Sequence, residues 1–409
     1  MEALDQLTDH SRSDVRIDSA LAAAEYEQRA MNSHHAATVA AVHTVLEEAR
    51  YSPEVFVGGH ASRSNRDHVE FAERAAIADL AVRLAVSENT IRAHEQQAVV
   101  MIARTPLTWE RFRWGEVSPA NARTVAESAA SLPDDDASAH SAFDAAIVEH
   151  AVRLAPARLK PVARKLRERL VAETAEDRHR SALESRRVVT EHALDGMGWL
   201  SAFLPAEVMT AALARLDAEA LILSAEPAET RTMDQLRADI LSGWLTGATS
   251  AAPVGVRLGV MVPMLSLLGL SEAPATLEGY GPIDAATARR LAGDATSIYR
   301  LLTDPVSGAV LDIDQPTKYI PKGLRRMRQV IDQTCTFPGC GRAAVRCDLD
   351  HTVDRQFGGR TTVMNLSHLC RKHHRVKHNT TWTIAQDESG RITWTSPTGR
   401  VVDPDPPPF

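Results

Sequence analysis

Residues 335–378 read CTFPGCGRAAVRCDLDHTVDRQFGGRTTVMNLSHLCRKHHRVKH and contain all four cysteines of the 409-residue chain. Cys335 and Cys340 form a Cys-x4-Cys pair, and Cys370 forms a Cys-x2-His pair with His373. Short intervals within each pair and a long interval between the pairs are typical of tetrahedral zinc sites with sulfur and nitrogen ligands. The stretch therefore predicts a structural Zn²⁺ bound by these three thiolates and one imidazole.

A second ligand set lies in the same stretch. Asp350, His374 and His378 offer a mixed nitrogen and oxygen set, which suits a catalytic divalent ion and leaves His351 free to act as a base. Together the two sets indicate a metal-dependent phosphodiesterase. Two alternatives stay open: Cys347 could replace another cysteine as a zinc ligand, although a buried strand position is preferred, and either of the adjacent histidines could serve either ion.

The charge of the chain is distributed unevenly. Residues 316–380 contain thirteen Lys/Arg against four Asp/Glu, a net charge of +9, whereas the whole chain carries −7 and the remainder therefore −16. A basic module on an acidic body predicts a polyanionic partner, with a solvated charged face as the alternative. The candidate phosphate contacts are Arg342, Arg355, Arg360, Arg371, Lys372, Arg375 and Lys377, although for each one singly a solvated surface charge is the preferred interpretation.

Length and composition point to a soluble protein of two to three domains. The chain has a mass of 44.5 kDa, is 44% hydrophobic and is rich in alanine, which favours helix. The polar N-terminus contains no apolar segment typical of a signal peptide, and the longest apolar run, Val256–Leu270, is interrupted by Arg257 and Pro263. This run is too short to span a bilayer, so we expect no membrane partner. Because every cysteine lies in the ligand-rich stretch, we expect a cytoplasmic protein.

The pattern predicts a mainly α protein with α+β parts. Its expected regions are a disordered N-terminus (1–15), a helical domain (16–185), an α+β continuation of that domain (186–315), a ligand-rich module (316–402) and a disordered proline-rich tail (403–409). Expected β-structure comprises a hairpin of Val188–His192 and Gly198–Leu204, a strand over Val254–Met264, and a hairpin of Ile298–Leu302 and Ala309–Ile313. Leu366–Lys377 is expected to be helical.

The ligand-rich module resembles the HNH endonuclease motif, the ββα-metal fold, in its zinc-stapled form. The matching residues are Cys335, Cys340, Asp350-His351, Gly358-Gly359, Asn365-Leu366, Leu369-Cys370, His373-His374 and Lys377-His378. The ordered combination is specific, whereas a Cys-x4-Cys or His-x3-His pair alone would be weak. A zinc module that kept this fold without the chemistry is the alternative.

The resemblance implies a catalytic mechanism. His351 would be the general base that activates water, and one ion (Mg²⁺, Mn²⁺, Ni²⁺ or Zn²⁺) would be held by Asp350 and His374, with His378 as an additional ligand. Asn365 would orient the loop or the base, although in some HNH enzymes that position touches the metal. The expected reaction is hydrolysis of phosphodiester bonds in double-stranded DNA; the alternative function is a non-cleaving, zinc-dependent DNA-binding regulator.

The segment Leu80–His94 resembles a helix-turn-helix. Its second helix would begin after an N-cap at Ser87 and present Glu88, Asn89, Arg92 and His94 outward. Helix pairing within a bundle is the preferred interpretation, because alanine-rich bundles often produce this pattern and the region is not basic.

From about Ala20 to Pro321 the chain also resembles the bacterial domain of unknown function that commonly precedes HNH modules. The segments that carry this likeness are Gly115–Arg123, Gln235–Asp239, Leu267–Leu270, Gly279–Ile283 and Thr303–Pro305. The resemblance implies no activity. A further hypothesis makes the acidic body a platform for an unidentified protein partner.

Overall fold

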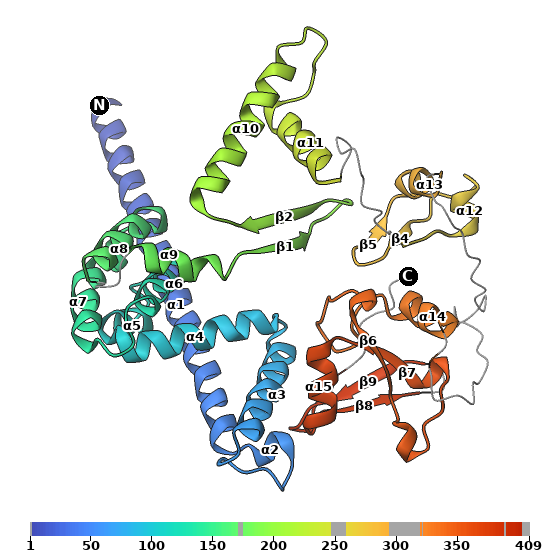
Figure 1. Ribbon diagram of the computed structural model, residues 1–409. Helices are drawn as coiled ribbons and strands as arrows, with labels where there is room; N and C mark the ends of the chain where they lie inside the picture. Colours follow the sequence, from blue (N-terminus) through green and yellow to red (C-terminus); the bar gives the residue numbers. More distant parts are fainter. Residues whose placement is uncertain are drawn as a thin grey trace. The chain divides into compact units, whose positions relative to one another are not determined.

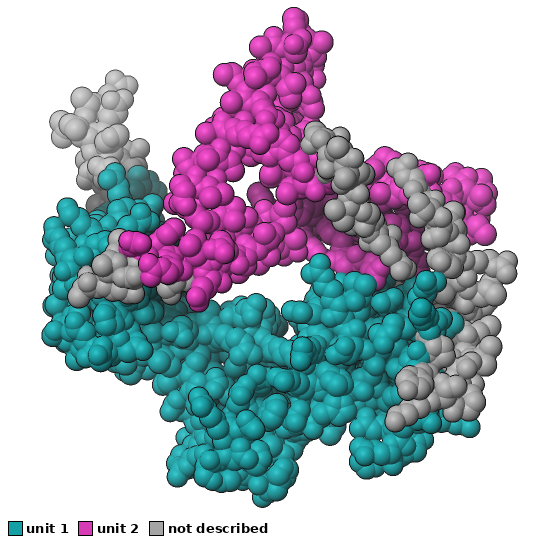
Figure 2. All heavy atoms as spheres, in the orientation of Figure 1, with its two compact units in different colours: residues 1–172, 302–407 teal, residues 173–301, 408–409 magenta. Residues whose placement is uncertain are grey.

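The computed structural model describes residues 2–170, 175–246, 259–293, 320, 322–387 and 390–402, with side chains from residue 16 onward except those of 175, 177, 178 and 181. The chain divides into two compact units, 1–172 with 302–407 and 173–301 with 408–409 (Figure 2). Most of the described chain is helical and the sheets are small. This confirms the predicted fold class.

The first unit begins with a body of helices. They are α1 (Glu2–Tyr51), α2 (Glu54–Val57), α3 (Arg66–Leu84), α4 (Glu88–Arg104), α5 (Pro106–Arg113), α6 (Pro119–Ala130), α7 (Ala137–Arg153) and α8 (Pro156–Leu170). The structure differs from the disorder expected for residues 1–15, because α1 is helical from Glu2. No glycine or proline precedes Pro53, so no residue interrupts this long helix.

Side-chain caps determine where the shorter helices begin. Asn65, Ser87, Ser118 and Asp136 each accept a hydrogen bond from a backbone N–H in the first turn of the following helix. Between α3 and α4, Ala85 adopts the left-handed conformation with φ 52°. The predicted N-cap at Ser87 is therefore confirmed, and α4 starts at Glu88.

Helices α4 to α8 enclose an apolar core. Phe112, Phe143 and Ile147 are fully buried in it. Asp144 is also buried, and its carboxylate accepts hydrogen bonds from the backbone N–H groups of Leu107 and Thr108 at the start of α5. The polar group thereby satisfies donors that a helix start leaves unpaired.

The ligand-rich module completes the first unit. Its elements are α14 (Lys322–Asp332), η1 (Ala344–Arg346), β6 (Asp348–His351), η2 (Arg355–Phe357), η3 (Val363–Asn365), β7 (Leu366–Leu369), α15 (Arg371–Asn379), β8 (Thr383–Gln386), β9 (Ile392–Thr395) and β10 (Val401–Val402). Strand β6 pairs antiparallel with β7, and β8, β9 and β10 form a second sheet. Figure 1 shows α15 beside these strands.

The helix predicted over Leu366–Lys377 was wrong in its first third. Residues 366–369 are a strand in register with β6, and Cys370 is the N-cap of α15. All four strand residues are buried, so both faces of this strand are covered. His368 has no exposed surface, and its Nδ1 atom lies 2.9 Å from Oδ2 of Asp332. The same aspartate pairs with the buried Arg328. Tertiary burial overrode the helical pattern here.

The module shares one hydrophobic core with helices α1 to α4. Phe337, Trp382 and Trp394 of the module pack in the same buried cluster as residues of these helices, including Ile77. The indole Nε1 of Trp382 donates to the carbonyl oxygen of Ala75 over 3.2 Å. Both tryptophans are buried and are therefore core residues.

The second unit contains the α+β region. Its elements are α9 (Ala175–Leu183), β1 (Arg187–His192), β2 (Gly198–Phe203), α10 (Ala206–Ser224), α11 (Met233–Thr246), β3 (Val260–Met261), α12 (Met264–Leu267), β4 (Ala275–Leu277), β5 (Gly281–Ile283) and α13 (Ala285–Gly293). Strands β1 and β2 form the predicted first hairpin, with Asp195 and Gly196 at positive φ between them.

Other predictions for this region are only partly covered by the structure. The predicted strand Val254–Met264 corresponds to β3 alone, since 254–258 lie outside the described residues and Met264 begins α12. The predicted hairpin over 298–313 and the tail 403–409 also lie outside the described residues. Among the described residues, no helix combines the length and apolar character needed to cross a membrane.

Candidate metal centres

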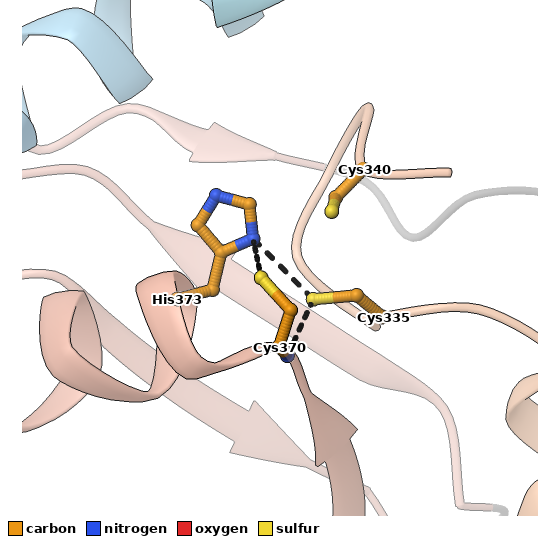
Figure 3. Close-up of side chains that lie close together, drawn as sticks. All are labelled: Cys335, Cys340, Cys370 and His373. Carbon is orange, nitrogen blue, oxygen red and sulfur yellow. Dashed lines mark hydrogen bonds between the residues drawn. The ribbon is translucent and has the colours of Figure 1, made fainter. Parts of the chain in front are cut away.

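The predicted zinc ligands come from two segments of the module. Cys335 and Cys340 flank a turn closed by a hydrogen bond from the backbone N–H of Cys340 to the carbonyl oxygen of Phe337, with Gly339 at φ 72°. Cys370 and His373 lie at the start of α15. Figure 3 shows the four side chains converging on one point.

The geometry of this group fits a tetrahedral zinc ion. One ligand atom from each residue lies within 4.8 Å of all the others. The Nδ1 atom of His373 is 3.3 Å from the sulfur of Cys335 and 3.4 Å from that of Cys370. A tetrahedral ion with ordinary Zn–S and Zn–N bonds separates such atoms by about 3.6 Å. No disulfide joins the four cysteines, so all the sulfurs could act as ligands.

Cys347, the alternative ligand, lies beside this group but outside it. Its thiol donates towards the carbonyl oxygens of Arg342 and Ala343, at 3.7 and 3.4 Å. The four-residue group within 4.8 Å does not contain it. The side chain is buried, so the arrangement agrees with the preferred interpretation of Cys347 as a packing residue.

The outer face of the zinc group is closed by protein. The ring of Phe337 stacks on the His373 imidazole with ring centres 4.1 Å apart. On the other nitrogen, His373 Nε2 donates to the Oε1 atom of Glu88, 2.6 Å away, and the Glu88 carboxylate also pairs with Lys372. Burial alone would raise the pKa of Glu88, but the bonds to His373 and Lys372 hold it below its ordinary value.

The helix-turn-helix resemblance, the less favoured interpretation of this segment, implies an outward-facing Glu88, and the structure differs. Glu88 opens α4 but points to the module, and its side chain is only 11% exposed. The start of α4 is therefore a contact between the helical body and the zinc group. Nothing in the local sequence distinguishes this glutamate, because its partner is 285 positions away.

The second ligand group forms between β6 and α15. One donor atom each of Asp350, His374 and His378 lies within 4.8 Å of the other two. Asp350 Oδ2 accepts from His378 Nε2 at 3.0 Å, and Asp350 Oδ1 is 3.7 Å from His374 Nε2. The two imidazoles are about one third exposed, at 36% and 34%. This group could hold a divalent ion that remains accessible to a substrate.

The side chain of Lys377 is not positioned to contact a phosphate group. Its side chain is 8% exposed, and its ammonium donates to Asp350 Oδ2 at 2.7 Å, to the His351 carbonyl oxygen, and to Asp354 Oδ1 at 3.3 Å. The prediction that Lys377 contacts nucleic acid is therefore corrected, because α15 turns this side chain towards β6. Burial would raise the pKa of Asp350, but Lys377 and the two histidines hold it below its ordinary value.

His351 lies next to Asp350 on β6, and alternation along the strand directs the two side chains to opposite faces. Its Nε2 atom is 3.1 Å from the hydroxyl of Thr361, which also accepts a bond from Arg355. Partial burial lowers the pKa of His351 below its ordinary value. Thr361 was not singled out from the sequence, because a threonine ten residues away carries no local signal.

Asn365 braces the loop that follows β6. Its side chain accepts from the backbone N–H of Val353 at 2.8 Å and donates to the carbonyl oxygens of Val353 and Arg360 at 3.0 and 2.8 Å. The loop passes so close that a Cβ on Gly359 would meet the Val353 carbonyl oxygen at 1.7 Å. Of the roles expected for Asn365, this geometry matches the orientation of the loop.

The remaining basic side chains differ in exposure. Lys372 is half-buried against Glu88. The exposed arginines of the module that were predicted to contact phosphate are Arg342, Arg355, Arg360, Arg371 and Arg375.

The family of the protein follows from a match that covers most of the chain. The family described as "Domain of unknown function (DUF222)" matches residues 26–332. The chain belongs to the DUF222 family. The match ends before Cys335, so both ligand groups follow the DUF222 region, whereas Glu88 lies within it.

Two curated proteins are similar to parts of this DUF222 protein. The chain is 33% identical over 145 residues to the uncharacterized protein Rv3776 of Mycobacterium tuberculosis, covering 33% of this chain and 27% of that protein. It is 42% identical over 82 residues to the uncharacterized protein Rv2100 of the same organism, covering 20% of this chain and 14% of the relative. The matches thus span less than a third of either relative. No solved structure matches the chain.

Proposed function

We propose that the protein is a metal-dependent endonuclease of the HNH type that hydrolyses DNA phosphodiester bonds. One observation carries the proposal: the donor atoms of Asp350, His374 and His378 converge within 4.8 Å, and His351 adjoins Asp350 on the same strand. Strand β6 supplies Asp350 and His351, and helix α15 supplies His374 and His378; strand β7, which pairs antiparallel with β6, leads into that helix. This arrangement supports the ββα-metal resemblance of the sequence.

Each residue has a role in this proposal. His351 accepts the proton of the attacking water, and the Thr361 hydroxyl fixes the orientation of its ring. Asn365 holds the loop after β6 in place. When bound by Asp350 and the two histidines, a divalent cation supplies charge neutralisation at the phosphate and the leaving oxygen. Cys335, Cys340, Cys370 and His373 bind a structural zinc.

The exposed arginines of the module support a nucleic-acid substrate. Arginine contacts to phosphate increase affinity without conferring sequence information. Arg371 and Arg375 are exposed on the helix that also carries His374 and His378. A phosphodiester bound along this helix would lie close to the proposed catalytic ion.

Nicking of supercoiled plasmid tests the proposal. The wild-type protein and a zinc-loaded His351→Ala variant are compared with Mg²⁺, Mn²⁺ or Ni²⁺ added. A matched control is His150→Ala, because His150 is an exposed histidine of α7 far from the module in sequence. We expect nicking by the wild type and the control and a loss of about 10²–10⁴-fold in the His351 variant. Equal nicking by all three proteins would refute the assigned base.

One observation favours a second candidate, a zinc-dependent DNA-binding protein that does not cleave. The Lys377 ammonium already neutralises Asp350 at 2.7 Å, so the carboxylate is satisfied without an ion. The same assay separates the two functions. Binding of plasmid without nicking under any of the three ions would favour the regulator.

A further inference from the structure

A glutamate of the helical body reaches a ligand of the zinc group. Glu88 is the first residue of α4, and the hydrogen bond of Ser87 to the backbone N–H of Thr90 sets the start of that helix. Its Oε1 atom accepts from His373 Nε2 at 2.6 Å. The DUF222 region thus contacts the zinc group through a side chain of its own.

The two nitrogens of His373 have separate partners. Nδ1 faces the sulfurs of Cys335 and Cys370 at 3.3 and 3.4 Å, while Nε2 faces Glu88. Because a carboxylate only accepts hydrogen bonds, Nε2 carries the proton and Nδ1 presents its lone pair to the metal position. A carboxylate behind a metal-bound histidine fixes the ring and makes it a stronger ligand.

The residues around the Glu88–His373 bond shield it from water and balance its charge. The Glu88 side chain is 11% exposed and that of His373 is 3% exposed, so water has little access to the bond between them. Lys372 pairs with the other carboxylate oxygen and balances its charge. Close by, the cysteines of the zinc group share a buried core with Ile77 and Ile91 of α3 and α4. Polar and apolar contacts therefore join the same two regions.

We propose that Glu88 is an outer ligand of the zinc site and couples zinc binding to docking of the helical body on the module. Zinc fixes the His373 ring so that its Nε2–H points to Glu88, and docking in turn holds the imidazole for zinc. Coupling of two binding events is reciprocal, so each strengthens the other by the same factor. The inference rests on the zinc site of the proposed function and is independent of DNA cleavage.

The same contact gives the helix-turn-helix pattern a different role. The residues that would enter a DNA groove lie at the start of α4, and Glu88 among them is bonded to His373 and Lys372. The tight turn at Ala85, with φ 52°, presents α4 to the module.

Release of zinc to a chromophoric chelator tests the coupling. Glu88→Gln keeps the size of the side chain but removes the charge that strengthens His373 as a ligand. We expect about 10–100-fold weaker zinc binding, the usual cost of losing an outer-shell partner. The matched control is Glu54→Gln, because Glu54 is also the first residue of a helix but is exposed. Lys372→Met retains the Glu88–His373 bond and should change zinc release much less.

Hydrogen exchange of wild-type protein gives a readout that does not depend on a variant folding. On zinc removal, the amides of Val86 and Thr90, which bond to Ala81 and Ser87, should exchange faster. Amides of α7, such as that of Ile147, should be unchanged. Unaltered exchange at the α3–α4 turn, or zinc release from Glu88→Gln at the wild-type rate, would overturn the coupling. Absence of plasmid nicking with both readouts intact would remove only the nuclease proposal.

Discussion

The two ligand groups on helix α15 differ in burial. At the start of the helix, His373 is 3% exposed and joins three cysteines, two of them fully enclosed. One residue further on, His374 is 36% exposed and faces a carboxylate. A closed set of sulfur and nitrogen ligands is typical of structural zinc, whereas a site that acts on a substrate keeps an open side. Burial therefore separates the two groups more clearly than ligand type does.

The largest effect is expected from the closed group. Cys370→Ser should abolish zinc binding and unfold the module, because structural zinc in small domains contributes about 10–16 kcal/mol at neutral pH. Zinc content and thermal melting measure this. The matched control is Cys347→Ser, since that thiol is also buried but lies outside the group of four converging ligand atoms. Loss of zinc from the control would place Cys347 among the ligands.

In the open group, loss of a ligand should affect activity and not stability. His374→Ala is expected to lower the plasmid nicking rate by about 10²-fold or more, because a metal ion contributes several kcal/mol to stabilising the transition state. Its melting temperature should remain close to that of the wild type, since the side chain is partly exposed. A large fall in melting temperature would contradict the proposed division between a structural and a catalytic group.

The residues of both groups could be predicted from the sequence because the spacing within each pair is local, although the pairs themselves are far apart. Cys335 and Cys340 are five positions apart, and His374 and His378 are one helical turn apart. The first hairpin and the helix caps likewise follow from adjacent residues. Their partners could not be predicted: Glu88 and Thr361 contribute through tertiary contacts that leave no pattern in the sequence.

Errors in the prediction arose where burial opposed a local pattern. Residues 366–369 were predicted as helix, yet they lie in a two-stranded sheet with both faces covered. Lys377 was grouped with the surface cations because it lies in a basic run, although the helix directs it towards Asp350 and Asp354. Counting charges in the sequence identifies a basic module. Only the fold shows which of its cations are paired with carboxylates.

Lys377 connects stability with ion binding in the open group. Lys377→Met should cost about 1–3 kcal/mol of folding stability, because Asp350 loses a charge-assisted hydrogen bond in a partly buried position. The same change removes a cation that competes for Asp350, so binding of Mn²⁺ should become several-fold tighter. Chemical denaturation and calorimetric titration with Mn²⁺ measure the two effects. Weaker Mn²⁺ binding in a folded variant would contradict competition by Lys377.

The smallest expected effect is on DNA binding, and it should depend on whether the substituted cation is exposed. Arg375→Ala removes an exposed cation of α15, so it should reduce the slope of log affinity against log salt concentration by about 1. Lys377→Met should leave that slope unchanged, because its ammonium is already bound by two aspartates. Arg153→Ala, an exposed arginine of α7 in the helical body, is the control. Fluorescence anisotropy of a labelled duplex over a range of salt concentrations measures all three. A reduced slope for Lys377→Met would mean that DNA displaces the ammonium from Asp350, and the open group would then acquire its ion only in the complex.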